Sequence, residues 1–79
     1  MKIPVIKKLV EHTSIEVLRQ AEEDLLEEKP LQIEVGGDDE GEQLTHIFAA
    51  IYILEQMQEG MEFKQALRAY TQKVRTSIS

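Results

Sequence analysis

The stretch Ile47-Phe48-Ala49-Ala50-Ile51-Tyr52-Ile53-Leu54 (IFAAIYIL) is apolar at eight successive positions. No proline or glycine interrupts the chain from Gln43 to Gln58, so the stretch is predicted to lie within one long helix. Eight successive apolar side chains point in every direction around a helix axis, and such a helix has to be enclosed by other elements. The rest of this 79-residue chain must therefore supply the enclosure.

The predicted long helix has a start signal and a stop signal. Asp39 is followed three residues later by Glu42, which predicts a capping pair at the start of the helix. Gly60 follows the last helical position and predicts a left-handed C-terminal stop. We therefore expect a helix that begins near residue 40 and ends just before Gly60.

The segment after Gly60 is predicted to be a second helix. Its apolar side chains recur at spacings of three and four and form one stripe: Phe63, Ala66, Leu67, Tyr70, Val74 and Ile78. The turn at Gly60 is very short, so the two C-terminal helices are predicted to be antiparallel neighbours.

A third helix is predicted to follow Thr13-Ser14-Ile15-Glu16, in which Thr13 and Glu16 have capping-box spacing. It is expected to run for about 15 residues and to end before Pro30, because the residue before a proline avoids the helical conformation. Its apolar side chains include Ile15, Leu18, Ala21, Leu25 and Leu26. The acids Glu22, Glu23, Asp24, Glu27 and Glu28 are assigned to its solvent-exposed face.

Two segments leave alternatives open. Ile3–Val10 fits a short helix with Pro4 in its first turn, but an extended segment is also compatible with its composition. Leu31–Val35 alternates apolar and polar residues before Gly36-Gly37, which indicates either a short strand or an extended loop that packs three apolar side chains against the helices. The predicted fold is a single all-α domain over residues 1–79, with three main helices.

Composition excludes several functions. The chain has no cysteine, which removes disulfides, thiolate zinc sites and cysteine nucleophiles. Its net charge of −6 opposes general nucleic-acid binding, and its longest apolar run is far shorter than the about 20 residues that span a bilayer. We expect a cytoplasmic protein without nucleic-acid or membrane partners. No motif predicts a catalytic residue or a cofactor.

Glu42 and His46 are the strongest candidate metal ligands. They lie four residues apart on one predicted helix face, with Asp39 near the same line. A carboxylate and an imidazole at this spacing can contribute to a zinc or iron site, which a two-fold axis would complete with a second pair. The alternative is that Glu42 caps the helix and His46 is a hydrogen-bonded, half-buried residue. This alternative predicts no metal.

The chain is predicted to act as a homodimer. A core of this size gives little stability, and the neighbouring helices are expected to leave one stripe of the long helix uncovered. Ala49, Ala50, Ile53 and Met57 are the predicted interface. The competing explanation is that the N-terminal segment closes the long helix completely and leaves a monomer. Charge is also uneven, since Glu16–Glu42 contains eleven acids and the segment after Glu62 contains four bases and no acid. These faces either remain solvated or attract each other between subunits. An unidentified protein partner is a further possibility.

Three segments resemble a small bacterial family of uncharacterised helical proteins. They are Lys2–Leu9, Gly41–His46, and the pattern Ala66-Leu67-Arg68-x-Tyr70-Thr71-x-x-Val74-Arg75. The resemblance covers nearly the whole chain. It implies a bacterial cytoplasmic protein with no assigned activity, so it carries no functional residue over to this sequence. An interaction or structural role is the leading hypothesis, and a metal-binding role built on Glu42 and His46 is the alternative.

Overall fold

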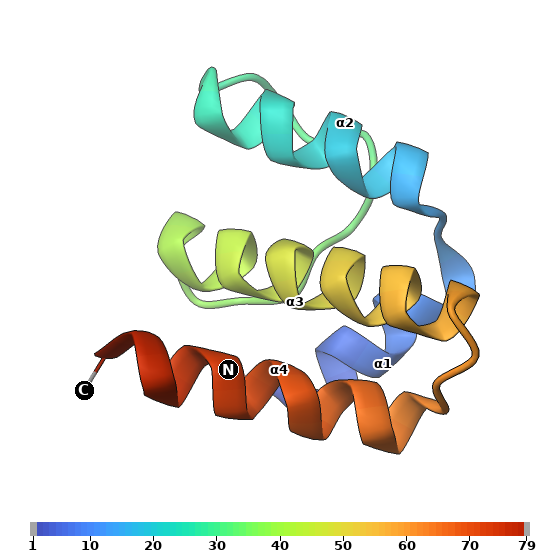
Figure 1. Ribbon diagram of the computed structural model, residues 1–79. Helices are drawn as coiled ribbons and strands as arrows, with labels where there is room; N and C mark the ends of the chain where they lie inside the picture. Colours follow the sequence, from blue (N-terminus) through green and yellow to red (C-terminus); the bar gives the residue numbers. More distant parts are fainter. Residues whose placement is uncertain (1, 79) are drawn as a thin grey trace.

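The apolar stretch lies in the central helix of a four-helix fold. The computed structural model describes the backbone of residues 2–78 and the side chains of residues 2–75. Its helices are α1 (Ile3–His12), α2 (Ile15–Leu26), α3 (Glu40–Gln58) and α4 (Phe63–Ile78), as Figure 1 shows. Residues 2–78 contain no strand, which confirms the all-α prediction.

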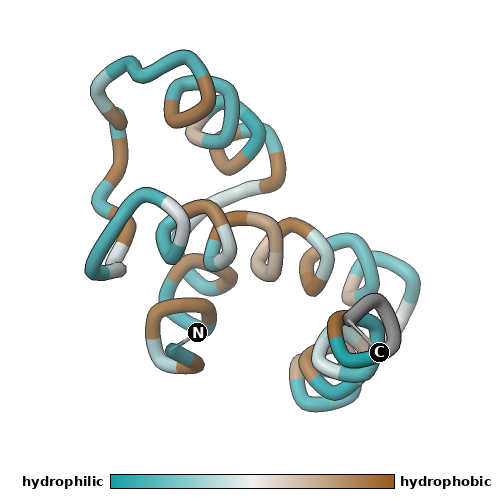
Figure 2. The backbone as a smooth tube through the Cα atoms, turned by 90° about the vertical axis from the view of Figure 1, so that its left-hand side faces the viewer, coloured by the Kyte–Doolittle hydropathy of each residue, from teal (hydrophilic) through white to brown (hydrophobic). Residues whose placement is uncertain are grey.

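Helix α3 is enclosed as its sequence requires. Each of the other three helices packs against α3, and within the described residues these three do not pack against one another. Figure 2 shows the apolar central turns of α3 between α2 on one side and α1 and α4 on the other. Ile6, Leu9 and Val10 of α1 are buried. The N-terminal segment is therefore a full helix and covers the side of α3 that was expected to be only partly covered.

The start of α2 is displaced by one residue from the predicted cap. Ser14, not Thr13, is the N-cap, and its Oγ accepts a hydrogen bond of 3.3 Å from the Val17 backbone N–H. The Thr13 hydroxyl instead donates to the Leu9 carbonyl at the end of α1. The predicted capping box was therefore wrong in register, because α1 extends to His12 and takes Thr13 as its own C-terminal residue.

Helix α2 ends earlier than predicted, in a Schellman motif. The Lys29 N–H donates to the Asp24 carbonyl at 2.7 Å, and the Glu28 N–H donates to the Leu25 carbonyl at 3.2 Å. Glu28 adopts the left-handed conformation that glycine usually takes at this position, with φ 59°. The motif turns the chain before Pro30 is reached.

Helix α3 ends in the same motif, with glycine in place. The Met61 N–H donates to the Gln56 carbonyl and the Gly60 N–H donates to the Met57 carbonyl, both at 3.1 Å. Gly60 has φ 104°, a conformation that residues with a Cβ rarely adopt. The predicted stop at Gly60 is confirmed.

Residues 31–35 form an irregular loop, so the possible strand is absent and the loop alternative is confirmed. Val35 is buried, and Leu31 and Ile33 pack partly buried against the core. The side-chain amide of Gln43 donates to the Val35 carbonyl at 3.2 Å. One hydrogen bond from α3, together with the packing of these apolar side chains, therefore holds the segment in place without a strand partner.

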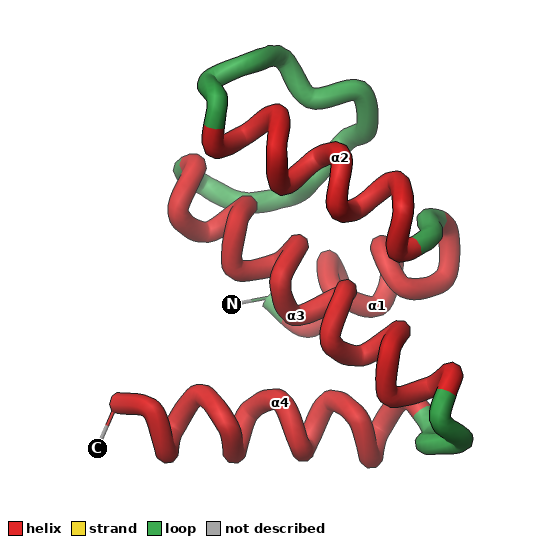
Figure 3. Tube along the Cα trace, turned by 45° about the horizontal axis from the view of Figure 1, so that its top comes forward, coloured by secondary structure: helices red, strands yellow, loops and turns green. Residues whose placement is uncertain are grey.

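Helix α4 runs antiparallel to α3 and packs on it over part of its length. The two helices are closest near their connecting turn and diverge towards the C-terminal end of α4 (Figure 3). The rings of Tyr52 and Tyr70 pack with centroids 5.6 Å apart, and burial raises the pKa of the Tyr70 hydroxyl. Beyond this contact Val74 is 36% exposed. The predicted stripe is thus buried only in its first half, and the side chain of Ile78 lies outside the described residues.

Candidate functional site

The sequence-predicted metal candidates lie at the start of α3. Asp39 is the N-cap, and its Oδ1 accepts a hydrogen bond of 2.7 Å from the Glu42 backbone N–H. The Glu42 carboxylate accepts from the Asp38 backbone N–H at 2.8 Å. This is the predicted capping pair, except that Glu42 reaches back to Asp38 rather than to Asp39.

His46 is fully buried, and both of its ring nitrogens have partners. The Lys2 backbone N–H donates to Nε2 at 2.9 Å, so Nε2 carries no hydrogen. Nδ1 therefore carries the hydrogen and donates to the Gly36 carbonyl, 2.7 Å away. The ring joins the segment before α1 to the loop before α3.

Lys2 also binds this region through its side chain. Its Nζ lies 3.4 Å from Asp38 Oδ1 and 3.7 Å from Glu42 Oε1. Together with the His46 hydrogen bonds, these ion pairs form what we call the N-terminal clamp, made of Lys2, Gly36, Asp38, Glu42 and His46. The clamp matches the alternative in which Glu42 is a cap and His46 is hydrogen-bonded, although His46 is more deeply buried than that alternative expected.

The clamp does not offer a metal site in this conformation. A metal at His46 would have to replace one of the two ring hydrogen bonds, and each replacement would leave a backbone group without its partner. Among the described residues, no three His, Asp or Glu side chains gather as a metal-binding group.

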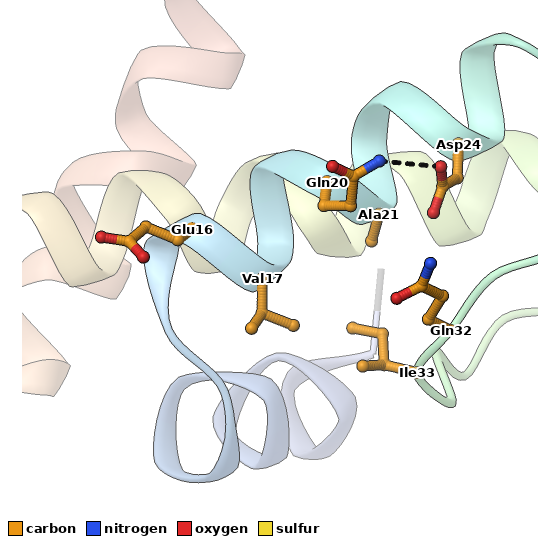
Figure 4. Close-up of a pocket in the computed structure, with 7 residues that line it drawn as sticks. All are labelled: Glu16, Val17, Gln20, Ala21, Asp24, Gln32 and Ile33. Carbon is orange, nitrogen blue, oxygen red and sulfur yellow. Dashed lines mark hydrogen bonds between the residues drawn. The ribbon is translucent and has the colours of Figure 1, made fainter.

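A different acid, Asp24, stands out in the structure. A groove of about 330 Å³ runs between α2 and the loop that follows it (Figure 4). It is lined by the apolar side chains of Val17, Ala21 and Ile33 and by the polar side chains of Glu16, Gln20, Asp24 and Gln32. We call it the α2 groove.

Asp24 is buried on the groove side of α2, only 5% exposed. Its Oδ1 accepts a hydrogen bond of 3.0 Å from the Gln20 side-chain amide, one turn earlier. Its Oδ2 is buried and has no hydrogen-bond partner among the described residues. Figure 4 shows this oxygen directed towards Gln32 and Ile33 of the loop. A buried carboxylate oxygen without a donor is unfavourable, so Asp24 Oδ2 is an open acceptor position in the wall of the groove.

The assignment of Asp24 to the exposed face was wrong. Asp24 lies on the same side of α2 as buried Ala21, which is nearly one turn earlier. The available signal was its spacing of three from buried Ala21. The acids around it hid that signal, because a run of acids is typical of a solvated face.

The predicted interface is largely inside the molecule. Ala49, Ala50 and Ile53 are fully buried in the single chain, and Met57 alone of the four is exposed. Helices α1, α2 and α4 all pack on α3, so the chain itself covers the side of α3 that the prediction left to a second copy. The dimer itself stays a prediction.

These features define a small all-α protein with one central helix, a polar clamp around the buried His46 ring, and a groove whose wall contains a buried acid with one unpaired oxygen. The chain belongs to the family of unknown function DUF6952, whose model matches residues 1–79. The comparisons with curated proteins and with solved structures found no match. Among the described residues, no helix has the length and apolar character needed to cross a membrane.

Proposed function

We propose that the chain is a protein-interaction module that works as a homodimer. The observation that supports this is its surface area. The chain exposes 5494 Å², whereas a compact monomer of 9.1 kDa exposes roughly 4,900 Å². The excess approaches the about 800 Å² that each partner buries in a standard interface.

The exposed apolar side chains support the same proposal. Large apolar residues are more than a third exposed on every helix or its flanks: Ile3, Val17, Leu26, Phe48, Met57, Met61 and Val74. Single exposed apolar residues are ordinary, but here some of them line grooves. A partner that covers these grooves would enlarge a core that is small for a chain without disulfides.

The oligomeric state tests this proposal. Sedimentation velocity or light scattering over 1–200 µM should give a mass near twice 9.1 kDa at the upper end. A mass near 9.1 kDa over the whole range would overturn it. Val74→Glu changes an exposed residue and should leave the fold intact, whereas Ile53→Glu would place a carboxylate in the core and unfold the chain.

Metal binding through Glu42 and His46 stays a prediction without structural support, because both residues already serve the N-terminal clamp. Elemental analysis of protein purified without chelator or affinity tag tests it. One zinc or iron per chain or per dimer, lost in His46→Ala, would establish it.

A further inference from the structure

The α2 groove has the chemistry of a site for a cation on an apolar stem. Asp24 supplies an acceptor oxygen without a donor, and Val17, Ala21 and Ile33 supply apolar walls. An ammonium or guanidinium group would satisfy the oxygen through a charge-assisted hydrogen bond, while its methylene stem packed on the walls. Within α2 the one base is Arg19, which is paired with Glu55 at 3.2 Å on the surface.

Access to Asp24 requires one side chain to move. Oδ2 is closed off from solvent in this conformation, and the Gln32 side chain reaches towards it from the loop (Figure 4). Gln32 is exposed and has no regular secondary structure around it. A rotation of its side chain can open the carboxylate to an incoming donor, and its own amide oxygen can then accept from the same cation.

The same chain carries a groove of complementary character. It lies between the start of α1 and α4, has a volume of about 250 Å³, and is lined by Ile3, Lys64, Leu67, Arg68 and Thr71. Ile3 is 48% exposed there, as Val17 is 40% exposed at the α2 groove. Among the described residues, no hydrogen bond or ion pair engages the side chain of Lys64 or Arg68, and the Thr71 hydroxyl donates only to the backbone carbonyl of Arg68. One groove is therefore apolar and acidic, and the other is apolar and basic.

Resting on the proposed homodimer, we propose that Arg68 of the partner subunit enters the α2 groove and pairs with Asp24. A planar guanidinium presents several donors at once, so it can serve Asp24 Oδ2 and the Gln32 amide oxygen together, which an ammonium does less well. The contact also brings Val17 and Ile3 together from the two copies and covers both. A two-fold axis makes the contact twice, once at each groove.

The charges of the two helices support this pairing over a chance contact. Helix α2 contains Glu16, Glu22, Glu23 and Asp24, with Arg19 as its single base. Helix α4 contains Lys64, Arg68, Lys73 and Arg75 and no acid. Two copies of the chain therefore attract each other when α2 of one subunit faces α4 of the other. They repel each other when the two α2 helices face each other, so the charges favour the proposed arrangement.

A double-mutant cycle on the dimer tests the pair. Dimer dissociation constants are measured by sedimentation equilibrium for the wild type, Asp24→Asn, Arg68→Met and the double variant. Each single variant should weaken the dimer at least about tenfold, because it leaves the other member buried and unpaired. The double variant should be no weaker than the singles, since the two changes remove one interaction. Lys7→Met, on the exposed side of α1, is the matched control and should change nothing.

The outcomes separate this inference from the proposed function. A wild type that stays monomeric overturns both. A stable dimer in which Asp24→Asn and Arg68→Met act additively or without effect overturns the inference alone. Weakening by Asp24→Asn but not by Arg68→Met assigns the cation to another residue and likewise overturns the Arg68 pairing.

A small competitor tests the source of the cation. Butylguanidinium at millimolar concentration should dissociate the wild-type dimer. In the Arg68→Met variant, studied at a concentration at which it is monomeric, it should shift the side-chain amide resonances of Gln20 and Gln32. Both effects should be absent in Asp24→Asn. Resonance shifts in the Arg68→Met variant without any effect on the wild-type dimer would show a site for free cations and overturn the role of the partner subunit.

Discussion

Helices α2 and α3 begin and end with the same kinds of motif, but they differ in how well their buried polar group and their left-handed terminal residue are satisfied. Each begins at a capping side chain, Ser14 or Asp39, and each ends in a Schellman motif. In α3 the buried polar residue is His46, with both nitrogens paired, and the left-handed position holds Gly60. In α2 the buried polar residue has an unpaired oxygen, and the left-handed position holds a glutamate.

The difference shows where stability is concentrated. Helix α3 forms the centre of the core, and its polar group and its end are both satisfied. Helix α2 has two unfavourable features, the unpaired oxygen of Asp24 and the left-handed conformation of Glu28. Such features are typical of a surface that serves binding rather than folding. The comparison therefore supports a structural role for α3 and is consistent with the recognition role proposed for α2.

The strongest way to break the comparison is to remove the satisfied polar group. His46→Ala should lower the free energy of unfolding by about 3 kcal/mol, because it leaves the Lys2 N–H and the Gly36 carbonyl without partners and opens a cavity. Urea unfolding followed by circular dichroism measures this. His46→Phe fills the space without either hydrogen bond and should recover only part of the loss. A loss below about 0.5 kcal/mol, within the range of ordinary surface substitutions, would refute the structural role of the clamp.

The end of α3 gives the next largest effect. Gly60→Ala should cost about 1.5 kcal/mol, because the backbone at φ 104° is strained for any residue with a Cβ. No atom lies within 4 Å of the added Cβ, so the loss would come from the backbone alone. Gly41→Ala, inside the first turn of α3, is the control and should stabilise the chain. Equal effects of Gly60→Ala and Gly41→Ala on the free energy of unfolding would contradict the conclusion that the backbone conformation at Gly60 requires glycine.

An apolar substitution of Asp24 is expected to increase stability, the opposite of the two preceding substitutions. In the Arg68→Met background, at a concentration at which that variant is monomeric, Asp24→Leu should raise the free energy of unfolding by about 1 kcal/mol, because it replaces an unsatisfied buried carboxylate with an apolar side chain of similar size. The same substitution should weaken the dimer. Thermal unfolding at 5 µM measures the first effect, and a loss of stability in that background would show that Asp24 is satisfied in the folded monomer.

The smallest effect is expected at the end of α2. Glu28→Gly should stabilise the chain by about 0.5 kcal/mol, since glycine adopts the left-handed conformation without a Cβ penalty. Glu27→Gly, one residue earlier and outside that conformation, is the control and should be neutral or destabilising. Matching shifts in melting temperature for the two variants would remove the contrast between α2 and α3 at this position.

The helices and their ends could be predicted because they depend on neighbours in the sequence. Gly60 and Asp39 act within one turn, and the apolar spacing of α4 is local as well. The unexpected features depend on residues far apart. Asp24 is covered by Gln32 and Ile33 of a returning loop, and His46 meets Lys2 across 44 positions. A polar residue at a core position cannot be distinguished from a surface residue until the covering segment is known.

The hydrogen bond from Lys2 to His46 has a consequence for exchange with solvent. Lys2 precedes α1, and a backbone amide in such a segment normally exchanges its hydrogen with water among the fastest in a protein. Here that hydrogen is held by a ring inside the core, so it should exchange only when α1 separates from α3. The lifetime of this one amide in deuterated water therefore reports how often the N-terminal helix opens, independently of global unfolding.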